Sequence, residues 1–290
     1  MTITRPGPNA STTHVKELTG GMRKLLWIAA TLVFLAGVQL FVFSERTERF
    51  FAWTIDFPLT AAFLGAAYWA SVAFEIGAAR QRVWAYARVA VPAVFVFTSL
   101  TLVATLLHLD LFHLGAEFET TTSAVTWFWI GIYAVVPVMM IVLAAKQWRA
   151  PGVDPPRGSA LPRWIAGVLW VHAVVMLVVG AALFIAPERT ASLWPWPLTP
   201  LTGRAVGAWV LSLGLAAAHS LWENDTRRLR PAAVGYIALG ILEAIAALRF
   251  VDDVDWARLQ AVVYVVFLAS MVVVGMAALR LAGQRRPAAR

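Results

Sequence analysis

The chain of 290 residues contains no cysteine, and only 14% of its residues are charged. Without cysteine it can form no disulfide, thiolate metal centre or thiol redox site. Soluble domains carry roughly a quarter charged residues, so the low charge excludes an ordinary soluble fold, a disordered chain and a nucleic-acid-binding domain. Lysine is also scarce. Because Lys16, Lys24 and Lys146 all lie outside the apolar runs, a retinal Schiff base is excluded.

The sequence also lacks the motifs of common enzymes. There is no Walker phosphate loop, no G-x-G-x-x-G after a strand, no serine nucleophile motif and no H-E-x-x-H zinc motif. Haem held between two histidines is disfavoured, because only His172 lies deep within an apolar run. We therefore regard an enzyme as the less favoured class and assign no cofactor.

Long apolar runs are what the chain does contain. Hydrophobic residues make up 60% of it, and its mean hydropathy is +0.71. A helix needs about 20 mostly apolar residues to cross a bilayer, and eight runs meet this requirement. We predict an all-α polytopic membrane protein whose eight transmembrane helices cover residues 25–43, 59–79, 89–109, 124–145, 164–186, 201–222, 232–251 and 259–279.

The distribution of charge predicts the orientation of these helices. The connections on one side, together with both termini, hold 18 of the 24 basic residues, and the connections on the other side hold 10 of the 16 acidic ones. Lys and Arg accumulate in cytoplasmic loops, so we expect both termini in the cytoplasm. The preference for Arg over Lys and the abundance of Ala and Val are typical of a GC-rich bacterial genome, so we expect a bacterial plasma-membrane protein. The basic residues of 280–290 are expected to contact anionic lipids of the bilayer, and no nucleic acid is expected as a partner.

Two parts of the chain share short segments at an offset of 142 or 143 residues. Pro-Leu-Thr occurs at 58–60 and again at 200–202, and a glycine follows five residues later in both copies. Such self-similarity indicates an internal repeat. Further pairs that match are Glu-Arg-Thr at 45–47 and 188–190, Arg88 and Arg230, and Asp110 and Asp252; Tyr133 and Tyr264 occupy similar places in the fourth helices.

We therefore expect two parallel four-helix repeats. Four helices are an even number, so both repeats would cross the membrane in the same direction and be related by a pseudo-two-fold axis along the membrane normal. The expected division is a cytoplasmic N-terminal tail at 1–22, a first repeat at 23–147, a cytoplasmic linker at 148–162, a second repeat at 163–281 and a basic cytoplasmic tail at 282–290.

Polar residues within the apolar runs are candidates for ligand binding, because a charge at the bilayer centre costs about 2.5–3.5 kcal/mol. Glu243 and His172 lie near the middle of their runs, and Thr101 is the counterpart of Glu243 in the first repeat. The alternative is a buried pair in which neutral Glu243 bonds to His172. Arg204 is a candidate for anion binding, although it could instead reach the interface or pair with Asp252 or Glu188. Glu75, close to the inner end of its run, is expected to reach cytoplasmic water.

The connection after the third run holds His108, Asp110 and His113. Imidazole and carboxylate ligands suit zinc or another divalent ion, so these three residues are candidate metal ligands. Their spacing fits no well-known ligand motif, and a solvated acidic loop is the alternative interpretation.

Residues 51–69, which contain Phe-Ala-Trp and Pro-Leu-Thr-Ala-Ala-Phe-Leu-Gly-Ala-Ala-Tyr-Trp, resemble a segment of an uncharacterised family of bacterial polytopic membrane proteins. That resemblance covers about twenty residues. The second half resembles DoxX-type four-helix membrane proteins, through the Pro-Glu-Arg segment after its first helix and the glycines of its second. The resemblance implies a four-helix unit and no particular activity.

Three functions remain open from the sequence. The first is binding or transport of a small or lipid-like molecule at the interface of the two repeats. The second is a non-catalytic accessory or assembly subunit, which implies a membrane-protein partner. The third is an intramembrane metal or redox enzyme.

Overall fold

The computed structural model describes residues 14–283. Within this range all regular secondary structure is helical, apart from isolated bridges such as the one between Trp53 and Phe112. The α-helices are α1 (Gly20–Gly37), α2 (Thr47–Phe50), α3 (Pro58–Ala79), α4 (Ala90–Leu107), α5 (Thr120–Trp148), α6 (Arg163–Ile185), α7 (Pro187–Thr190), α8 (Pro200–Glu223), α9 (Arg230–Arg249) and α10 (Leu259–Gly283); a π-helical turn, Val38–Val42, extends α1.

Eight of the described helices are long and apolar enough to cross a membrane, which confirms the predicted all-α polytopic fold. Their outward surfaces carry large apolar side chains, for example Phe34 of α1, Ile141 of α5, Val178 of α6 and Val266 of α10, which are between 49% and 63% exposed. An apolar surface of this extent requires lipid rather than water. The protein is an integral membrane protein, and its helices contact lipid.

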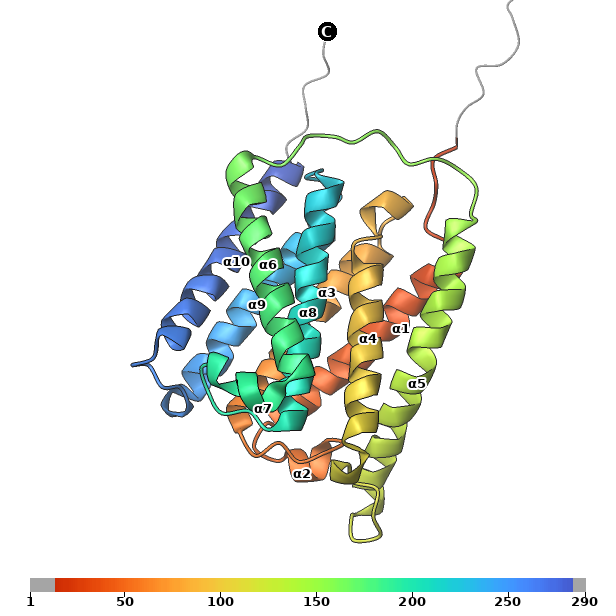
Figure 1. The fold of residues 1–290 in the computed structure, drawn as a ribbon. Coiled ribbons are helices and arrows are strands. Elements are labelled where there is room, and N and C mark those ends of the chain that lie inside the picture. The colour runs from red at the N-terminus through yellow and green to blue at the C-terminus, as the bar shows by residue number, and fades with distance from the viewer. Residues whose placement is uncertain (1–13, 284–290) are drawn as a thin grey trace, which may run out of the picture.

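Helices α3 and α8 are the most buried of the eight and lie at the centre of the molecule (Figure 1). Helix α3 packs against α1 and α9, whereas α8 packs against α6 and α4. Helix α9 also packs against α10, and α4 against α5. The two halves of the chain are thus interleaved, and one apolar core includes residues of both.

Glycine permits the closest helix contacts. A Cβ atom on Gly65 of α3 would lie 2.4 Å from the backbone nitrogen of Phe41, and one on Gly207 of α8 would lie 2.8 Å from the backbone nitrogen of Phe184. No larger residue fits at either position without moving the backbone. The second helix of each half therefore packs tightly against the first through a glycine at the same place in the sequence pattern.

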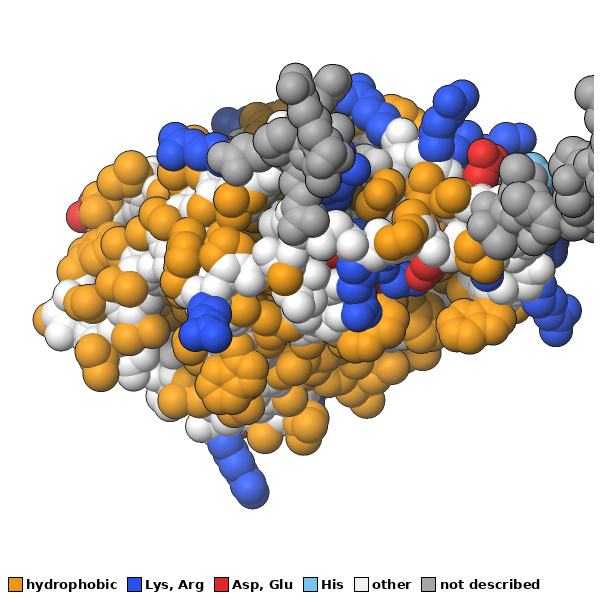
Figure 2. Space-filling model, turned by 90° about the horizontal axis from the view of Figure 1, so that it is seen from above, with side chains coloured by type: hydrophobic (Ala, Val, Ile, Leu, Met, Phe, Trp, Pro, Cys, Tyr) orange, Lys and Arg blue, Asp and Glu red, His pale blue; other side chains and the backbone are white. Residues whose placement is uncertain are grey.

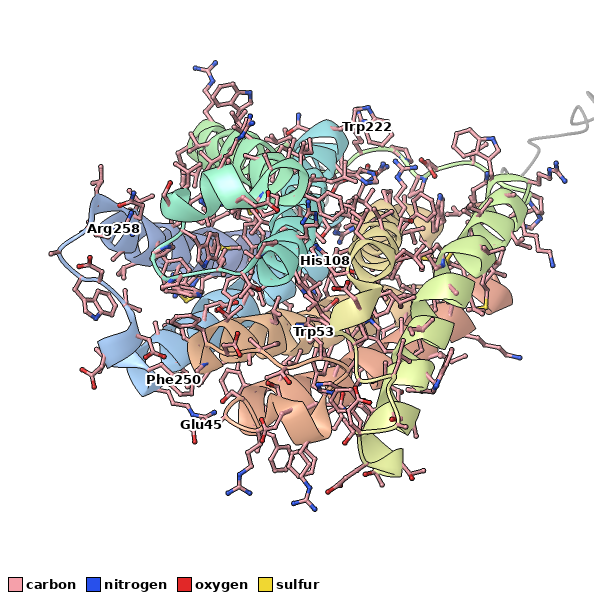
Figure 3. All side chains as sticks on the ribbon, turned by 60° about the horizontal axis from the view of Figure 1, so that its bottom comes forward. Glu45, Trp53, His108, Trp222, Phe250 and Arg258 are labelled. Carbon is pink, nitrogen blue, oxygen red and sulfur yellow. The ribbon has the colours of Figure 1, made fainter. Side chains whose placement is uncertain are left out.

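The two ends of the helices differ in charge. We call the end with connections 80–89, 149–162 and 224–229 the basic face; both described ends of the chain lie there (Figure 1). Figure 2 looks onto this face and shows many Lys and Arg side chains and few acidic ones. We call the opposite end the acidic face; in Figure 3, His108 and Trp53 lie toward its middle, and Glu45, Phe250 and Arg258 lie nearer its edge.

The expected segment boundaries differ from the helices by a few residues. Helix α1 begins at Gly20, inside the expected tail 1–22, because Thr19 caps it by accepting a hydrogen bond from the Met22 backbone. The expected linker 148–162 overlaps the loop between α5 and α6. Residues 1–13 and 284–290, which include most of both expected tails, lie outside the described residues.

Candidate functional site

The largest of the described cavities, about 140 Å³, is bordered by Glu243. Its walls come from α6, α8, α9 and α10 and from residues 193–195 before α8, and Phe63 of α3 adds one side chain from the first half of the chain. The Tyr264 hydroxyl donates a hydrogen bond to Oε2 of Glu243 at 3.1 Å, whereas Oε1 is buried without a partner. The remaining walls are almost entirely apolar, including Met176, Leu239 and Met271. We call this space the Glu243 cavity.

His172 does not pair with Glu243, contrary to one interpretation of the sequence. Its Nε2 lies 2.8 Å from Ser270 Oγ, and the Ser270 hydroxyl itself donates to the carbonyl of Phe267. Nε2 must therefore carry the proton, which leaves Nδ1 as a buried acceptor without a partner. Ser270 and Tyr264 are six residues apart on α10, or about 9 Å along its axis, so the two candidate residues lie at different depths.

Thr101 and Arg204 lie away from the Glu243 cavity. Thr101 is buried in α4, and its hydroxyl has no partner among the described residues. Arg204, in the first turns of α8, donates to Nε2 of His108 at 2.8 Å and lies 3.7 Å from a Glu188 carboxylate oxygen. The structure thus joins Arg204 to a candidate metal ligand at the acidic face.

The two histidines of the acidic face have protein partners for their ring nitrogens. His113 is 2% exposed; its Nδ1 donates to the Phe51 carbonyl and its Nε2 accepts from Thr54, both at 3.0 Å. The lone pairs that a metal would need on His108 and His113 therefore already accept hydrogen bonds. Among residues 14–283 no group of three or more His, Asp or Glu side chains could hold a metal ion, and Asp110 joins no such group. A metal site at these residues stays a prediction.

Burial shifts the acid–base behaviour of both imidazoles. It lowers the pKa of His113 below its ordinary value of 6.5. Burial, and then the positive charge of Arg204, lower the pKa of His108 in the same direction. Both rings are thus neutral at neutral pH, which agrees with their hydrogen bonds.

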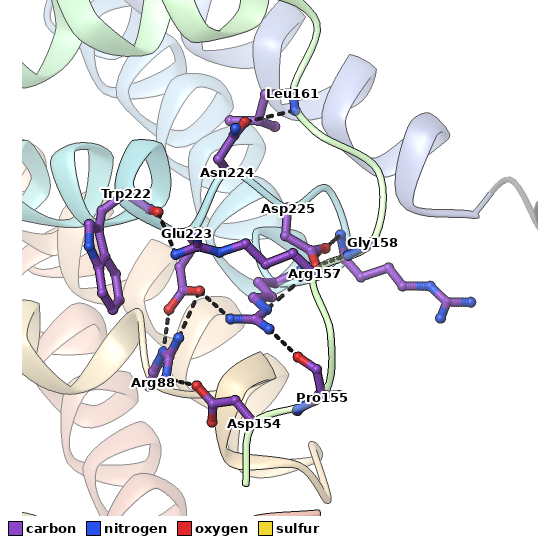
Figure 4. Close-up of polar contacts among 12 residues, drawn as sticks. Arg88, Asp154, Pro155, Arg157, Gly158, Leu161, Trp222, Glu223, Asn224 and Asp225 are labelled. Atoms are coloured by element: carbon purple, nitrogen blue, oxygen red, sulfur yellow. Dashed lines mark hydrogen bonds and ion pairs between the residues drawn. The ribbon is translucent and has the colours of Figure 1, made fainter.

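The basic face contains a buried ion-pair network that the sequence did not reveal (Figure 4). Glu223, at the end of α8, is fully buried and accepts hydrogen bonds from Arg88 and from Arg228, the latter at 2.7 Å. Arg88 also pairs with Asp154 of the loop between α5 and α6. Because Arg88 precedes α4 and Glu223 ends α8, the network connects the two halves of the chain. We call these four residues the inner network.

The same face holds the α5–α6 loop in place. Arg228 donates to the carbonyl of Pro155 at 2.7 Å, and Asp225 accepts from the backbone nitrogen of Gly158 at 2.6 Å (Figure 4). Asn224, in the left-handed conformation with φ 43°, accepts from the backbone nitrogen of Leu161. The expected linker is therefore packed onto the ends of α8 and α9.

One signal in the sequence could have indicated this network. Glu223, Asp225 and Asp154 are acidic residues on a face where nearly all charges are basic, and isolated acids among basic residues are natural ion-pair partners.

The expectation that Glu75 reaches cytoplasmic water is wrong, because Glu75 is 1% exposed and borders cavities inside the helix assembly. It accepts a hydrogen bond from Ser71 and is otherwise surrounded mainly by apolar side chains, so it does not reach water as expected.

No family model, curated protein or solved structure matches this chain. The likeness to DoxX-type proteins therefore remains an expectation from the sequence. Function has to be inferred from the geometry described above.

Proposed function

We propose that this integral membrane protein binds a small apolar or lipid-like molecule in the Glu243 cavity, among helices of the second half and beside Phe63 of the first. The observation that carries the proposal is the partnerless Oε1 of Glu243 beside a cavity of about 140 Å³. A buried oxygen without a donor costs about 1–3 kcal/mol. A ligand that donates a hydrogen bond there would recover that cost.

The shape of the cavity limits the ligand. An apolar cavity of about 150 Å³ holds a benzene-sized molecule, and the walls of the Glu243 cavity offer dispersion contacts with Phe63, Phe267 and Met271. The best fit is an apolar body of that size with one hydroxyl or amine donor. Binding is the part of the transport hypothesis that this geometry supports.

Fluorine NMR of the purified protein with fluorinated benzyl alcohol and fluorinated toluene tests the proposal. The two probes have the same ring, and only the alcohol can donate to Glu243. We expect the alcohol to bind about tenfold more tightly than toluene, which corresponds to about 1.4 kcal/mol. Glu243→Met should abolish this difference, whereas Glu75→Gln should leave it. Equal affinities for both probes in the unchanged protein would contradict the proposal.

We also propose that the two halves arose by duplication and retain the same orientation in the membrane. Matched contacts support this: Gly65 meets Phe41 as Gly207 meets Phe184, and α3 packs on α9 as α8 packs on α4.

The excess of Lys and Arg on the basic face supports a cytoplasmic location for that face in a bacterial plasma membrane, in contact with anionic lipids. Reporter fusions within 149–162 and at the C-terminus test the orientation. Activity of both on the outer side would contradict it.

A further inference from the structure

Glu75 supplies a second buried carboxyl group, and it borders two cavities at once. One of about 40 Å³ lies among α3, α4, α8 and α9, and the other, of about 60 Å³, lies among α1, α3, α4 and α5. Oε1 of Glu75 accepts a hydrogen bond from Ser71 at 3.2 Å, whereas Oε2 is buried without a partner. A guest in either cavity would therefore meet a carboxyl group with an unused acceptor. We call this region the Glu75 site.

Aromatic rings form much of the remaining wall. Phe97 borders both cavities, and its ring centroid lies 3.9 Å from that of Trp209 and 5.7 Å from that of Tyr68. The other rings that border the two cavities are Phe74, Tyr236, Trp129 and Tyr133. The Tyr236 hydroxyl is a further buried group without a partner. The site thus combines one carboxyl group with several aromatic rings and a hydroxyl that can accept a hydrogen bond.

This combination favours a cation over other guests. A cation that displaces the proton of this buried carboxyl group leaves a carboxylate as its counter-charge, which an anion cannot do, and a purely apolar guest would leave Oε2 of Glu75 and the Tyr236 hydroxyl unsatisfied. A cation is attracted to the face of an aromatic ring, and an ammonium group also has several N–H donors. The carboxyl group and the aromatic rings would therefore both contribute to the binding of an ammonium group.

The volumes restrict its size. Each cavity exceeds the ~10–15 Å³ of probe-occupied volume needed to hold one water molecule, and each is well below the ~150 Å³ that admits benzene. We propose that the Glu75 site binds a small monovalent ammonium cation, either ammonium itself or a singly methylated amine. This site is separate from the Glu243 cavity and does not depend on the function proposed for it.

Equilibrium dialysis of the purified protein with radiolabelled methylammonium, in sodium chloride buffer at neutral pH, tests the inference. We expect saturable binding that ammonium chloride displaces and an equal addition of sodium chloride does not. Glu75→Gln should weaken binding at least about tenfold. Glu243→Gln, the same chemical change in the other cavity, should leave it unchanged, and this keeps the two proposals distinguishable.

A second variant covers the case in which Glu75→Gln fails to fold. Phe97→Leu retains the carboxyl group and removes one ring that borders both cavities, so it should weaken methylammonium binding about fivefold. Absence of saturable binding to the unchanged protein would overturn the inference and indicate cavities that hold only water. Unchanged affinity in either Glu75→Gln or Phe97→Leu would overturn it as well.

Discussion

The Glu243 cavity and the Glu75 site contain similar groups in different arrangements. In the second half of the chain, Tyr264 of α10 bonds directly to Glu243 of α9. In the first half, Tyr133 of α5 bonds to Tyr68 of α3 at 2.6 Å, and Glu75 has only Ser71 as a partner. Each half thus has a tyrosine on its last long helix, α5 or α10, but only Tyr264 of α10 hydrogen-bonds to a carboxyl group.

If the two halves are duplicates, as proposed, their buried carboxyl groups have changed position since the duplication. At the offset of 142 residues, Thr101 stands where the second half has Glu243, and Ala217 stands where the first half has Glu75. All four residues are buried. Under the proposed duplication, single substitutions therefore decide which half offers a carboxyl group, and on which helix.

The largest expected loss of stability comes from a change in α8, the helix that borders both regions. Helix α8 borders the Glu243 cavity and the Glu75 site, and Glu223 at its end neutralises Arg228, which is 3% exposed. Glu223→Gln leaves that buried arginine without its full counter-charge and should lower the free energy of unfolding by about 3 kcal/mol. Thermal and denaturant unfolding in detergent measure this change.

The matched control in the inner network is Asp154→Asn. The Asp154 side chain is 35% exposed, so its loss should cost less than about 1 kcal/mol. Equal stability of Glu223→Gln and the unchanged protein would show that the inner network does not hold the two halves together.

The next largest effect compares the two close glycine contacts. An alanine Cβ at Gly65 would lie 2.4 Å from backbone, against 2.8 Å at Gly207. Overpacking of this kind costs about 1–3 kcal/mol, and we expect Gly65→Ala to be the more destabilising. The unfolding temperatures of the two variants measure the order. The reverse order would indicate that α8, and not α3, is the less tolerant central helix.

The two tyrosines provide a smaller and more direct comparison. Tyr264→Phe removes the hydroxyl that donates to Oε2 of Glu243, whereas Tyr133→Phe removes one hydroxyl from the neutral hydrogen-bonded pair with Tyr68. Leaving a carboxyl group without a partner costs more than leaving a hydroxyl, so Tyr264→Phe should be less stable than Tyr133→Phe by about 1 kcal/mol. Equal losses in denaturant unfolding would remove the distinction between the two regions.

The smallest effect concerns the acidic face of the first half, where buried His113 has no counterpart in the shorter loop of the second half. Because burial holds the pKa of His113 below 6.5, the folded protein binds this proton less readily than the unfolded chain does. The contribution of neutral His113 to the free energy of unfolding is therefore fully present above pH 6.5 and is lost as the pH falls through the lower pKa of the folded protein.

The unfolding temperature should therefore decrease on acidification below about pH 6.5, and His113→Gln should make the decrease shallower. His14→Gln, a change at an exposed histidine, serves as the control. An identical pH profile for His113→Gln and the unchanged protein would show that His113 does not contribute.

The sequence by itself determined the number of membrane-crossing helices and the separation of basic from acidic connections. Both follow from local properties: the length of an apolar run against the thickness of a bilayer, and the sign of the charges between runs. Glu243 could be picked out in the same way, because a carboxyl group in an apolar run is conspicuous on its own.

Only the tertiary structure decided which groups meet. Arg88 and Glu223 are 135 residues apart in the chain, Arg204 and His108 are 96 apart, and Tyr264 instead of His172 bonds to Glu243. Helices that are apolar around their whole circumference carry no sequence signal for the face that meets each neighbour. Close packing of glycines and side-chain shapes sets those faces, and with them the partners of every buried polar group.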